Sequence, residues 1–442
     1  MPTEVSVKKR KGIFPGYLMA IAGGTMLYWA CGAYMYSFGN FVKPLTDAFN
    51  WSRAQVSIAF SLARLEGGFE APIAAIATDK WGPRVVCLIG FILLGLGFIA
   101  MYYVNSLWMF YGIWLIGSTG YNLGVTRPLE AAMANWFVRR RGFMVSLMRL
   151  GMSLSGPTMV PFMMWLLLQY GWQKAFLYTG VATIFIGVPL ILFFIKPRRP
   201  EYYGWMPDGK RVDEEMAADT EATIKKGVEY AAEREEVEFT VRQAMRDKTF
   251  WIFTVAVSLR GMVHPVLTVH TVPFLLDMGI DPMVAAAAVG TIVFARFPTN
   301  LFFGWLGDHI PKEQLRYWAM LGHAMEAIGI FFLIKATSMS WVWAYVILSG
   351  LGNGASMAIT SPLRGRYWGR KAFGTIAGTI AGFSTVAGIV SPIYAGWAYD
   401  TTGSYTSAFT IILILTVISI VVMFFATPPK PPEKITHITD FV

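Results

Sequence analysis

The chain has 442 residues, of which 55% are hydrophobic and 14% are charged, and its formal net charge at pH 7 is +10. This composition excludes an ordinary soluble domain and indicates a membrane protein that spends most of its length in a lipid bilayer. The positive charge does not indicate a nucleic-acid-binding protein, because Lys and Arg gather in alternate loops and not on one face. By the positive-inside rule, the same alternation predicts a multi-pass protein of the cell membrane with both termini in the cytoplasm.

Apolar stretches recur along the whole chain, and we predict a helical span at each, since about 20 apolar residues cross the hydrocarbon core. The first begins at Phe14, and it is too long to be the core of a signal peptide. The twelve predicted spans lie at about 14–38, 55–78, 85–104, 107–133, 143–169, 174–195, 249–274, 284–307, 317–335, 341–362, 373–398 and 405–427. The predicted class is therefore an all-α membrane protein with twelve transmembrane helices in two pseudo-symmetric six-helix bundles.

The chain is expected to divide between the sixth and seventh spans. Residues 196–248 are polar and mixed in charge, which predicts a cytoplasmic linker between an N-terminal bundle, 1–195, and a C-terminal bundle, 249–427. The Pro-rich end, 428–442, is predicted to be a disordered cytoplasmic tail.

The two halves repeat one another. Asp79 and Arg84 follow the second span as Asp308 follows the eighth, and Pro157 in the fifth span corresponds to Pro392 in the eleventh at a similar offset. A repeat of this length in a membrane chain is typical of a two-bundle transporter.

The loop at 79–84, with its second-half echo, resembles the signature of the major facilitator superfamily. A narrower resemblance is to the monocarboxylate and oxalate/formate branch, and its residues lie at 36–39, 51–53, 135–142, 199–209 and 270–279. The resemblance implies alternating access by rocking of two six-helix bundles, with a cavity lined mainly by spans 1, 2, 4, 5, 7, 8, 10 and 11. It also implies that Asp79, Arg84 and Asp308 are gate residues.

The eighth span departs from the branch pattern. The family's arginine usually stands where this chain has Asn300, and here the arginine is one helical turn earlier, at Arg296. An acidic residue expected one turn before the arginine is replaced by Ile292. The family's usual proton-coupling pair is therefore incomplete.

Charged residues inside the second half predict an anion site. A cation near mid-membrane is expensive, so Arg296 must face a partner, a wet cavity or a ligand. Arg260 and His264 stand one helical turn apart in the seventh span, while Glu326 in the ninth is a single carboxylate against two guanidinium groups. We therefore predict that Arg296, Arg260 and His264, with Asn300, bind the substrate. The alternative is that Glu326 pairs with one arginine and water solvates the other.

The first half carries balanced charges. Glu70, Arg127, Glu130 and Arg149 lie about a third of the way in from the cytoplasmic side, which predicts an ion-pair network that closes this side in one conformation. Glu66 is nearer mid-depth, and it is the carboxylate predicted to couple transport to protons.

Aromatic residues line several cavity spans. Tyr121 and Asn122, in a glycine-rich run of the fourth span, and Tyr36 in the first are predicted to contact substrate. Bulky walls around few polar groups favour a small organic acid over a sugar.

These patterns predict a secondary transporter for a small organic anion, a monocarboxylate, with proton symport or exchange against a counter-anion. The alternative is an exporter of lipophilic or cationic compounds on the same fold, since Gly156-Pro157 resembles the Gly-Pro of drug antiporters. We do not expect an enzyme, a cofactor or a metal site, because the sequence shows no His-Glu metal spacing, nucleophile elbow or phosphate loop.

Overall fold

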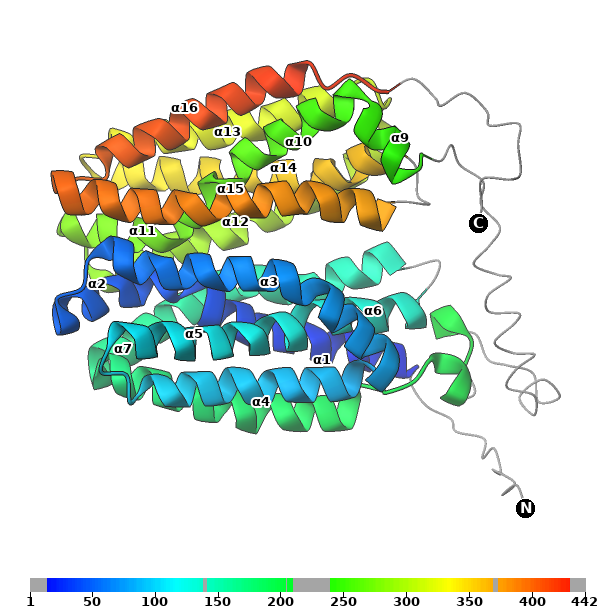
Figure 1. Cartoon of the computed structure of the whole chain (residues 1–442), viewed down its shortest axis with the longest axis horizontal. Coiled ribbons are helices and arrows are strands. Elements are labelled where there is room, and N and C mark those ends of the chain that lie inside the picture. The colour runs from blue at the N-terminus through cyan, green and yellow to red at the C-terminus, as the bar shows by residue number, and fades with distance from the viewer. Residues whose placement is uncertain (1–13, 138–140, 204, 210–238, 369–372, 430–442) are drawn as a thin grey trace. The chain divides into compact units, whose positions relative to one another are not determined.

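The computed structural model describes residues 14–137, 141–203, 205–209, 239–368 and 373–429 (Figure 1). The described chain forms two compact units. Unit 1 comprises Met1–Arg234 and Thr268–Phe294, and unit 2 comprises Glu235–Leu267 and Ala295–Val442. Each unit is described by itself below.

Unit 1 begins with a helical stretch in which a π-helix, η1, joins two α-helices. A second π-helix, η2, interrupts the stretch that corresponds to the fourth predicted span, and α7 is two helices that meet at Gly171. The elements are α1 Pro15–Ala30, η1 Cys31–Tyr36, α2 Phe38–Phe49, α3 Arg53–Trp81, α4 Pro83–Met101, α5 Leu107–Tyr121, η2 Asn122–Thr126, α6 Arg127–Trp136, α7 Arg141–Phe194, and the short 3₁₀ helices η3 Pro200–Tyr203 and η4 Pro207–Gly209.

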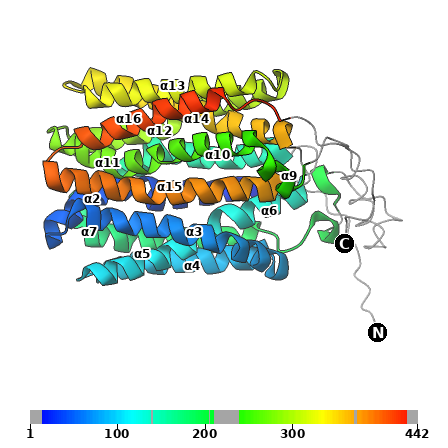
Figure 2. The same cartoon turned by 45° about the horizontal axis from the view of Figure 1, so that its top comes forward.

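Unit 2 contains most of the remaining helices (Figures 1 and 2). They are α9 Val241–Arg246, α10 Lys248–Gly261, α11 Val263–Asp277, α12 Pro282–His309, α13 Leu315–Ile334, α14 Met339–Trp368, α15 Phe373–Thr402 and α16 Thr406–Phe424. The later part of α11 and the earlier part of α12 belong to unit 1.

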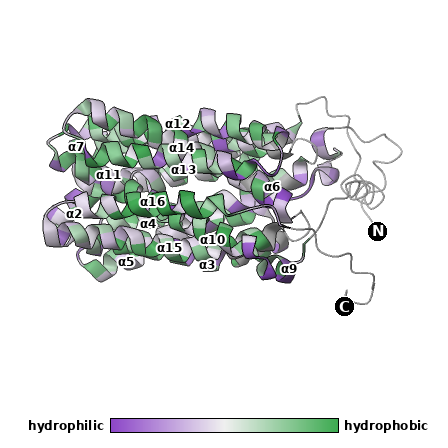
Figure 3. Ribbon diagram, turned by 90° about the horizontal axis from the view of Figure 1, so that it is seen from above, coloured by the Kyte–Doolittle hydropathy of each residue, from purple (hydrophilic) through white to green (hydrophobic). Residues whose placement is uncertain are grey.

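Each of the twelve predicted spans corresponds to a helical stretch within the described residues. Nine stretches there are long and apolar enough to cross a membrane, and one of these, Phe143–Phe194, contains both the fifth and the sixth predicted spans. The other two spans correspond to α3 and to the α5–η2–α6 stretch, which carry charged side chains such as Glu66 and Glu130. Hydrophobic residues run along the helices, while α9 is largely hydrophilic (Figure 3). The predicted all-α membrane class is confirmed.

Local signals explain where several helices begin and end. Ser52 and Gln55 form a capping box at the start of α3. Gly82 separates α3 from α4 with a φ of 80°, a conformation that favours glycine, and Pro83 then starts α4. A Cβ on Gly90 would lie 2.2 Å from the Cα of Gly124, so α4 and η2 can meet only because both residues are glycine.

The segment Thr268–Phe294 packs closely on the first-half helices. A Cβ on Gly39 of α2 would lie 2.8 Å from the carbonyl oxygen of Thr268 in α11. A Cβ on Gly156 of α7 would lie 2.4 Å from the carbonyl oxygen of Gly290 in α12. Backbone contacts this close explain why the segment belongs to unit 1.

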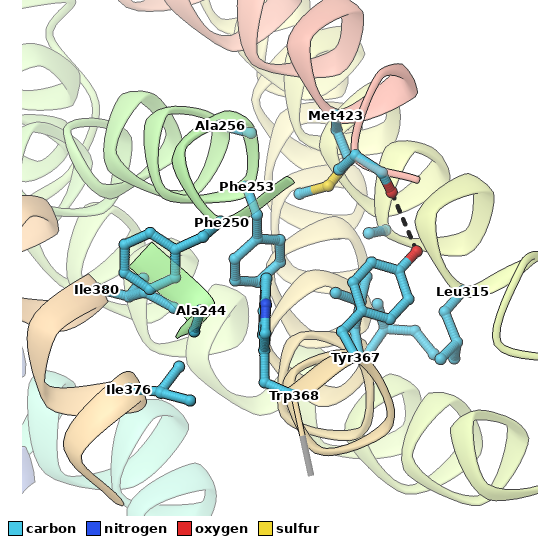
Figure 4. Packing of buried hydrophobic residues seen from close by; sticks show 14 of the residues in the cluster. Ala244, Phe250, Phe253, Ala256, Leu315, Tyr367, Trp368, Ile376, Ile380 and Met423 are labelled. Carbon is cyan, nitrogen blue, oxygen red and sulfur yellow. Dashed lines mark hydrogen bonds between the residues drawn. The ribbon is translucent and has the colours of Figure 1, made fainter. Parts of the chain in front are cut away.

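The core of unit 2 gathers at the ends of α10, α14 and α16 (Figure 4). Trp368 is fully buried, and its ring centroid lies 5.5 Å from that of Phe253. Next to it, the hydroxyl of Tyr367 donates to the carbonyl of Ala426 at 3.0 Å. This packing anchors α10, the helix on which Arg260 lies two turns beyond Phe253.

The predicted domain boundaries remain a prediction. Residues 210–238 of the predicted linker and 430–442 of the predicted tail lie outside the described residues. The two compact units are also composed differently from the two predicted bundles, because Thr268–Phe294 groups with the first half.

Candidate functional site

Unit 2 contains a buried ion pair between α10 and α13. The Nε of Arg260 lies 3.2 Å from Oε2 of Glu326, and their side chains are 14% and 2% exposed. The amide of Asn353 on α14 donates to the other carboxylate oxygen, Oε1, at 3.2 Å. Arg260 also donates from its Nη2 to the backbone carbonyl of Asn353 at 3.4 Å. Three helices therefore meet at one carboxylate.

Glycines set the position of that carboxylate. A Cβ on Gly352 of α14 would lie 2.6 Å from the backbone nitrogen of Glu326 and the same distance from the carbonyl oxygen of Gly322. Helices α13 and α14 can approach this closely because neither residue has a side chain. The close approach brings Asn353, the next residue of α14, within reach of Glu326.

His323 lies one turn before Glu326 and is 1% exposed. Its Nδ1 lies 2.8 Å from the hydroxyl of Ser419 on α16. That hydroxyl donates to the carbonyl of Ala256 at 3.0 Å. Because the hydroxyl proton is used there, Nδ1 of His323 is the donor to Ser419. His323 thus links α13 to α16 and α10.

The backbone of Arg296 packs against α14. A Cβ on Gly354 would lie 2.5 Å from the carbonyl oxygen of Arg296 and 2.9 Å from its Cα. The preceding residue, Asn353, accepts a hydrogen bond from the guanidinium of Arg260. Consecutive residues of α14 therefore contact the Arg260 side chain and the Arg296 backbone.

The other two predicted ligands of this half lie nearby in the chain. Asn300 is part-buried one turn after Arg296 on α12, and His264 is part-buried just after the break between α10 and α11. Guanidinium groups bind carboxylates through a planar fork of donors. Arg260 and Arg296 are therefore the side chains of unit 2 whose chemistry matches a carboxylate.

The predicted ligands of the first half gather at the two π-helices. The Cys31 thiol of η1 lies 3.3 Å from the hydroxyl of Tyr121, which immediately precedes η2. The rings of Tyr34 and Tyr121 stack with centroids 5.2 Å apart. Tyr36, the last residue of η1, is buried. Short π-helical segments inside α-helices are frequent at functional sites.

Asn122 and Glu66 lie where α3 packs on the stretch of the fourth predicted span. Asn122 contacts α3, and Glu66 of α3 contacts α5. The amide of Asn122 donates to the hydroxyl of Ser118 at 3.1 Å, and it packs on Gly67, where a Cβ would lie 2.8 Å from the amide nitrogen. Thr119 donates to Oε1 of Glu66 at 2.6 Å. Ser118 and Thr119 were not predicted, although they belong to the same glycine-rich run as Tyr121.

The predicted gate residues are partly brought together. Nε of Arg149 donates to Glu130 at 3.0 Å, across α7 and α6. Among the described residues, no hydrogen bond or ion pair joins Arg127 or Glu70 to this pair, and Arg127 is exposed. Arg84 donates to the carbonyl of Leu192.

Two further gate predictions fall on side chains outside the described ones. These are Asp79 at the end of α3 and Asp308 at the end of α12. Their role as gate residues stays a prediction.

A strong ion pair that the sequence did not predict joins α3 to α11 within unit 1. Nη1 and Nη2 of Arg53 lie 2.7 and 2.9 Å from the two carboxylate oxygens of Asp277. Lys43 lies 3.7 Å from the same carboxylate, and Ser57, one turn after Arg53, lies 3.3 Å from Nε2 of the buried His270. Both segments appeared in the resemblance, but no spacing rule links residues so far apart in sequence.

Comparison with known proteins finds a match to the family model described as Major Facilitator Superfamily, over residues 13–379 and 327–440. Monocarboxylate transporter 13 of Bos taurus is 24% identical over 85% of this chain and 81% of its own length. Monocarboxylate transporter 11 of Homo sapiens is 23% identical over 84% and 75%, respectively. The uncharacterized MFS-type transporter YcxA of Bacillus subtilis is 20% identical over 91% and 93%.

Solved structures show a similar fold. A bacterial homologue of the human lysosomal transporter Spinster, in an inward-facing and occupied conformation, has a TM-score of 0.71 at 12% identity and covers 94% of this chain and 97% of its own. The D-xylose–proton symporter has a TM-score of 0.71 at 13% identity, with coverage of 93% and 98%. At these identities the likeness concerns the fold alone.

Proposed function

The chain belongs to the major facilitator superfamily, and we propose that it is a secondary active transporter for a small organic anion, a monocarboxylate. Transport proceeds by alternating access, in which the substrate site opens first to one side of the membrane and then to the other. Proton symport or exchange against a second anion supplies the driving force. The protein resides in the cell membrane, with both termini in the cytoplasm.

The observation that supports an anionic substrate most strongly is that two arginines of unit 2 come from helices packed on the same part of α14. The guanidinium of Arg260 reaches Asn353, and the backbone of Arg296 packs on the next residue, Gly354. Guanidinium groups provide paired donors for the oxygens of a carboxylate. His264 and Asn300 complete the proposed ligands of this unit.

The first-half residues support a small substrate. Tyr36, Tyr121 and Asn122 lie in or beside the two π-helices, where aromatic rings and a few polar atoms occur together. Such surroundings suit a short organic acid better than a sugar, which needs more hydrogen-bonding partners. The similarity to monocarboxylate transporters 13 and 11 agrees with this substrate class.

The predicted gate and coupling residues keep their proposed roles. Asp79, Arg84 and Asp308 act at helix ends, and Glu70, Arg127, Glu130 and Arg149 close one side in one conformation. Glu66 is the carboxylate that the sequence singles out for proton coupling, and it is compared with Glu326 below.

The test is uptake of radiolabelled lactate, pyruvate, formate and oxalate into proteoliposomes, for the wild type and Arg296→Ala. We expect uptake of at least one acid, and a loss of about tenfold or more in the variant, which corresponds to about 1.4 kcal/mol. Lys335→Ala, which removes an exposed cation at the end of α13, is the matched control and should transport normally.

The contrary results are also informative. If none of the four acids moves, or if Arg296→Ala transports like the wild type, the organic-anion proposal fails. The exporter of lipophilic or cationic compounds would then be tested by efflux of a fluorescent cation from the same vesicles.

A further inference from the structure

We propose that Glu326 carries the coupling proton and thereby controls whether Arg260 is available to the substrate carboxylate. This inference rests on the proposed function, because it names the coupling residue of the anion transporter. It assigns that role to the second half of the chain, at a residue where the sequence offered only a structural pairing.

Glu326 and Arg260 are both largely removed from solvent. The Glu326 side chain is 2% exposed, and Arg260, its charged contact, is 14% exposed. Removing a carboxylate from water costs several kcal/mol unless a partner compensates its charge. In the described structure, Arg260 supplies that compensation from another helix. The protonation of Glu326 therefore depends on whether Arg260 is in contact with it.

The two oxygens of the Glu326 carboxylate have different partners. Arg260 approaches Glu326 through Nε alone, at 3.2 Å, and the other carboxylate oxygen accepts from the neutral amide of Asn353. A two-pronged guanidinium–carboxylate contact would be stronger. This single-pronged contact leaves the Glu326 side chain held by Asn353 when the arginine turns to another carboxylate.

The charges of the Arg260–Glu326 pair depend on what is bound. With neither proton nor substrate, Arg260 and Glu326 cancel. When the substrate carboxylate takes Arg260 and Glu326 is protonated, the charges cancel again. If the substrate takes Arg260 while Glu326 stays ionised, one guanidinium faces two carboxylates, which is costly in surroundings of low dielectric. Arg296 carries the same positive charge in every loading state. Anion binding at Arg260 therefore favours uptake of a proton by Glu326.

The other charged and titratable groups around Glu326 do not replace Arg260 as its ion-pair partner. On its own helix, His323 uses Nδ1 on Ser419 of α16. From α14 the contact is Asn353, which is neutral, and from α10 it is Arg260. Arg296 lies on the α12 side of α14, at Gly354. In the described structure, Arg260 is the cation in direct contact with Glu326.

Glu66 lacks this connection. Its Oε1 accepts from the neutral hydroxyl of Thr119, and its Oε2 is buried without a hydrogen-bond partner among the described residues. Within the described part of the chain, no ion pair joins Glu66 to a cation, so its protonation would release no guanidinium for the substrate.

The experiment compares two modes of transport in proteoliposomes, with labelled lactate as the probe if the wild type moves it, or otherwise whichever tested acid it moves. One mode is uptake driven by an inward proton gradient, and the other is exchange against the same unlabelled acid without a gradient. Glu326→Gln keeps the size and the acceptor for Asn353 but cannot gain or lose the proton. We expect it to lose gradient-driven accumulation at least about tenfold and to retain exchange.

Two further variants sharpen the result. Glu326→Asp keeps a titratable carboxylate and should restore gradient-driven uptake in part, with a shifted pH profile. Glu313→Gln removes an exposed carboxylate just before α13 and should behave like the wild type. If Glu326→Gln is not recovered folded, the pH shift of Glu326→Asp decides, and an unshifted profile overturns the inference.

The possible failures are distinguishable. If the wild type moves none of the acids, the proposed function fails. If the wild type accumulates acid with the gradient and Glu326→Gln does so equally well, the inference alone is overturned. Loss of the gradient effect in Glu66→Gln but not in Glu326→Gln would assign coupling to the first half instead.

Discussion

Two arginine–carboxylate pairs among the described residues differ in geometry and in exposure. In unit 1, both terminal nitrogens of Arg53 donate to Asp277, and Lys43 is a second cation at the same carboxylate. The Asp277 side chain is 24% exposed. In unit 2, Arg260 touches Glu326 with one nitrogen, and the Glu326 side chain is 2% exposed.

The difference teaches what each pair is suited to do. The Arg53–Asp277 pair has the geometry that gives guanidinium–carboxylate contacts their greatest strength, and it fastens the start of α3 to the end of α11. The Arg260–Glu326 pair has weaker geometry in surroundings where a change of charge has a larger effect. The first pair suits a structural role, and the second suits a switch that responds to a proton and an anion.

The largest effect is expected from breaking the buried pair on one side. Arg260→Ala leaves the Glu326 charge uncompensated, which should lower the free energy of unfolding by about 3–5 kcal/mol and abolish gradient-driven transport. Thermal unfolding in detergent measures the first and uptake the second. The double variant Arg260→Met/Glu326→Leu should regain most of the stability but no transport. Equal melting temperatures for Arg260→Ala and the wild type would contradict the assignment of a buried, coupled pair.

A smaller effect is expected at the partly exposed pair. Arg53→Ala removes two charge-assisted hydrogen bonds and should cost about 1.5–3 kcal/mol. Lys43→Ala, the control at the same carboxylate, removes a contact of 3.7 Å between more exposed groups and should cost about 0–1 kcal/mol. Unfolding in detergent checks both. If the two variants lose equal stability, the bidentate geometry of Arg53 has no special role.

The smallest expected effect concerns the packing of α12 on α14 near Arg296. Gly354→Ala would place a Cβ 2.1 Å from Oγ1 of Thr299 and 2.5 Å from the carbonyl oxygen of Arg296, so α12 must shift. The expected cost is about 1–3 kcal/mol, with reduced uptake because Arg296 moves. On α15, nothing lies within 4 Å of a Cβ on Gly382, so Gly382→Ala should leave both quantities nearly unchanged. Wild-type uptake by Gly354→Ala would show that substrate binding does not depend on how Arg296 is placed against α14.

The sequence was sufficient for the fold because long apolar stretches identify most of the spans, and the repeat of the two halves accounts for the rest. The apolar stretches predicted the helices, and the loop at 79–84 led to the superfamily that the family model confirms. The pairing of Glu326 with one of the two arginines was predicted as an alternative, since a buried carboxylate needs a nearby cation. The sequence left open which arginine it would be.

Contacts between distant spans could not be predicted. Arg53 and Asp277 meet because α11 packs on first-half helices, and sequence spacing contains no information on which helix ends face one another. Asn353 was missed because an amide in a glycine-rich run has no distinctive pattern. The π-helices at Cys31–Tyr36 and Asn122–Thr126 were missed for a similar reason, because the extra residue per turn changes no residue type.

Proton binding that accompanies anion binding tests the central claim most directly. Purified protein in weakly buffered detergent solution, with a pH indicator, is titrated with lactate or whichever acid is transported. The account predicts uptake of about one proton per bound anion in the wild type and none in Glu326→Gln, by linkage between the two binding events. Anion binding with no proton uptake in the wild type, or with undiminished proton uptake in Glu326→Gln, would contradict it.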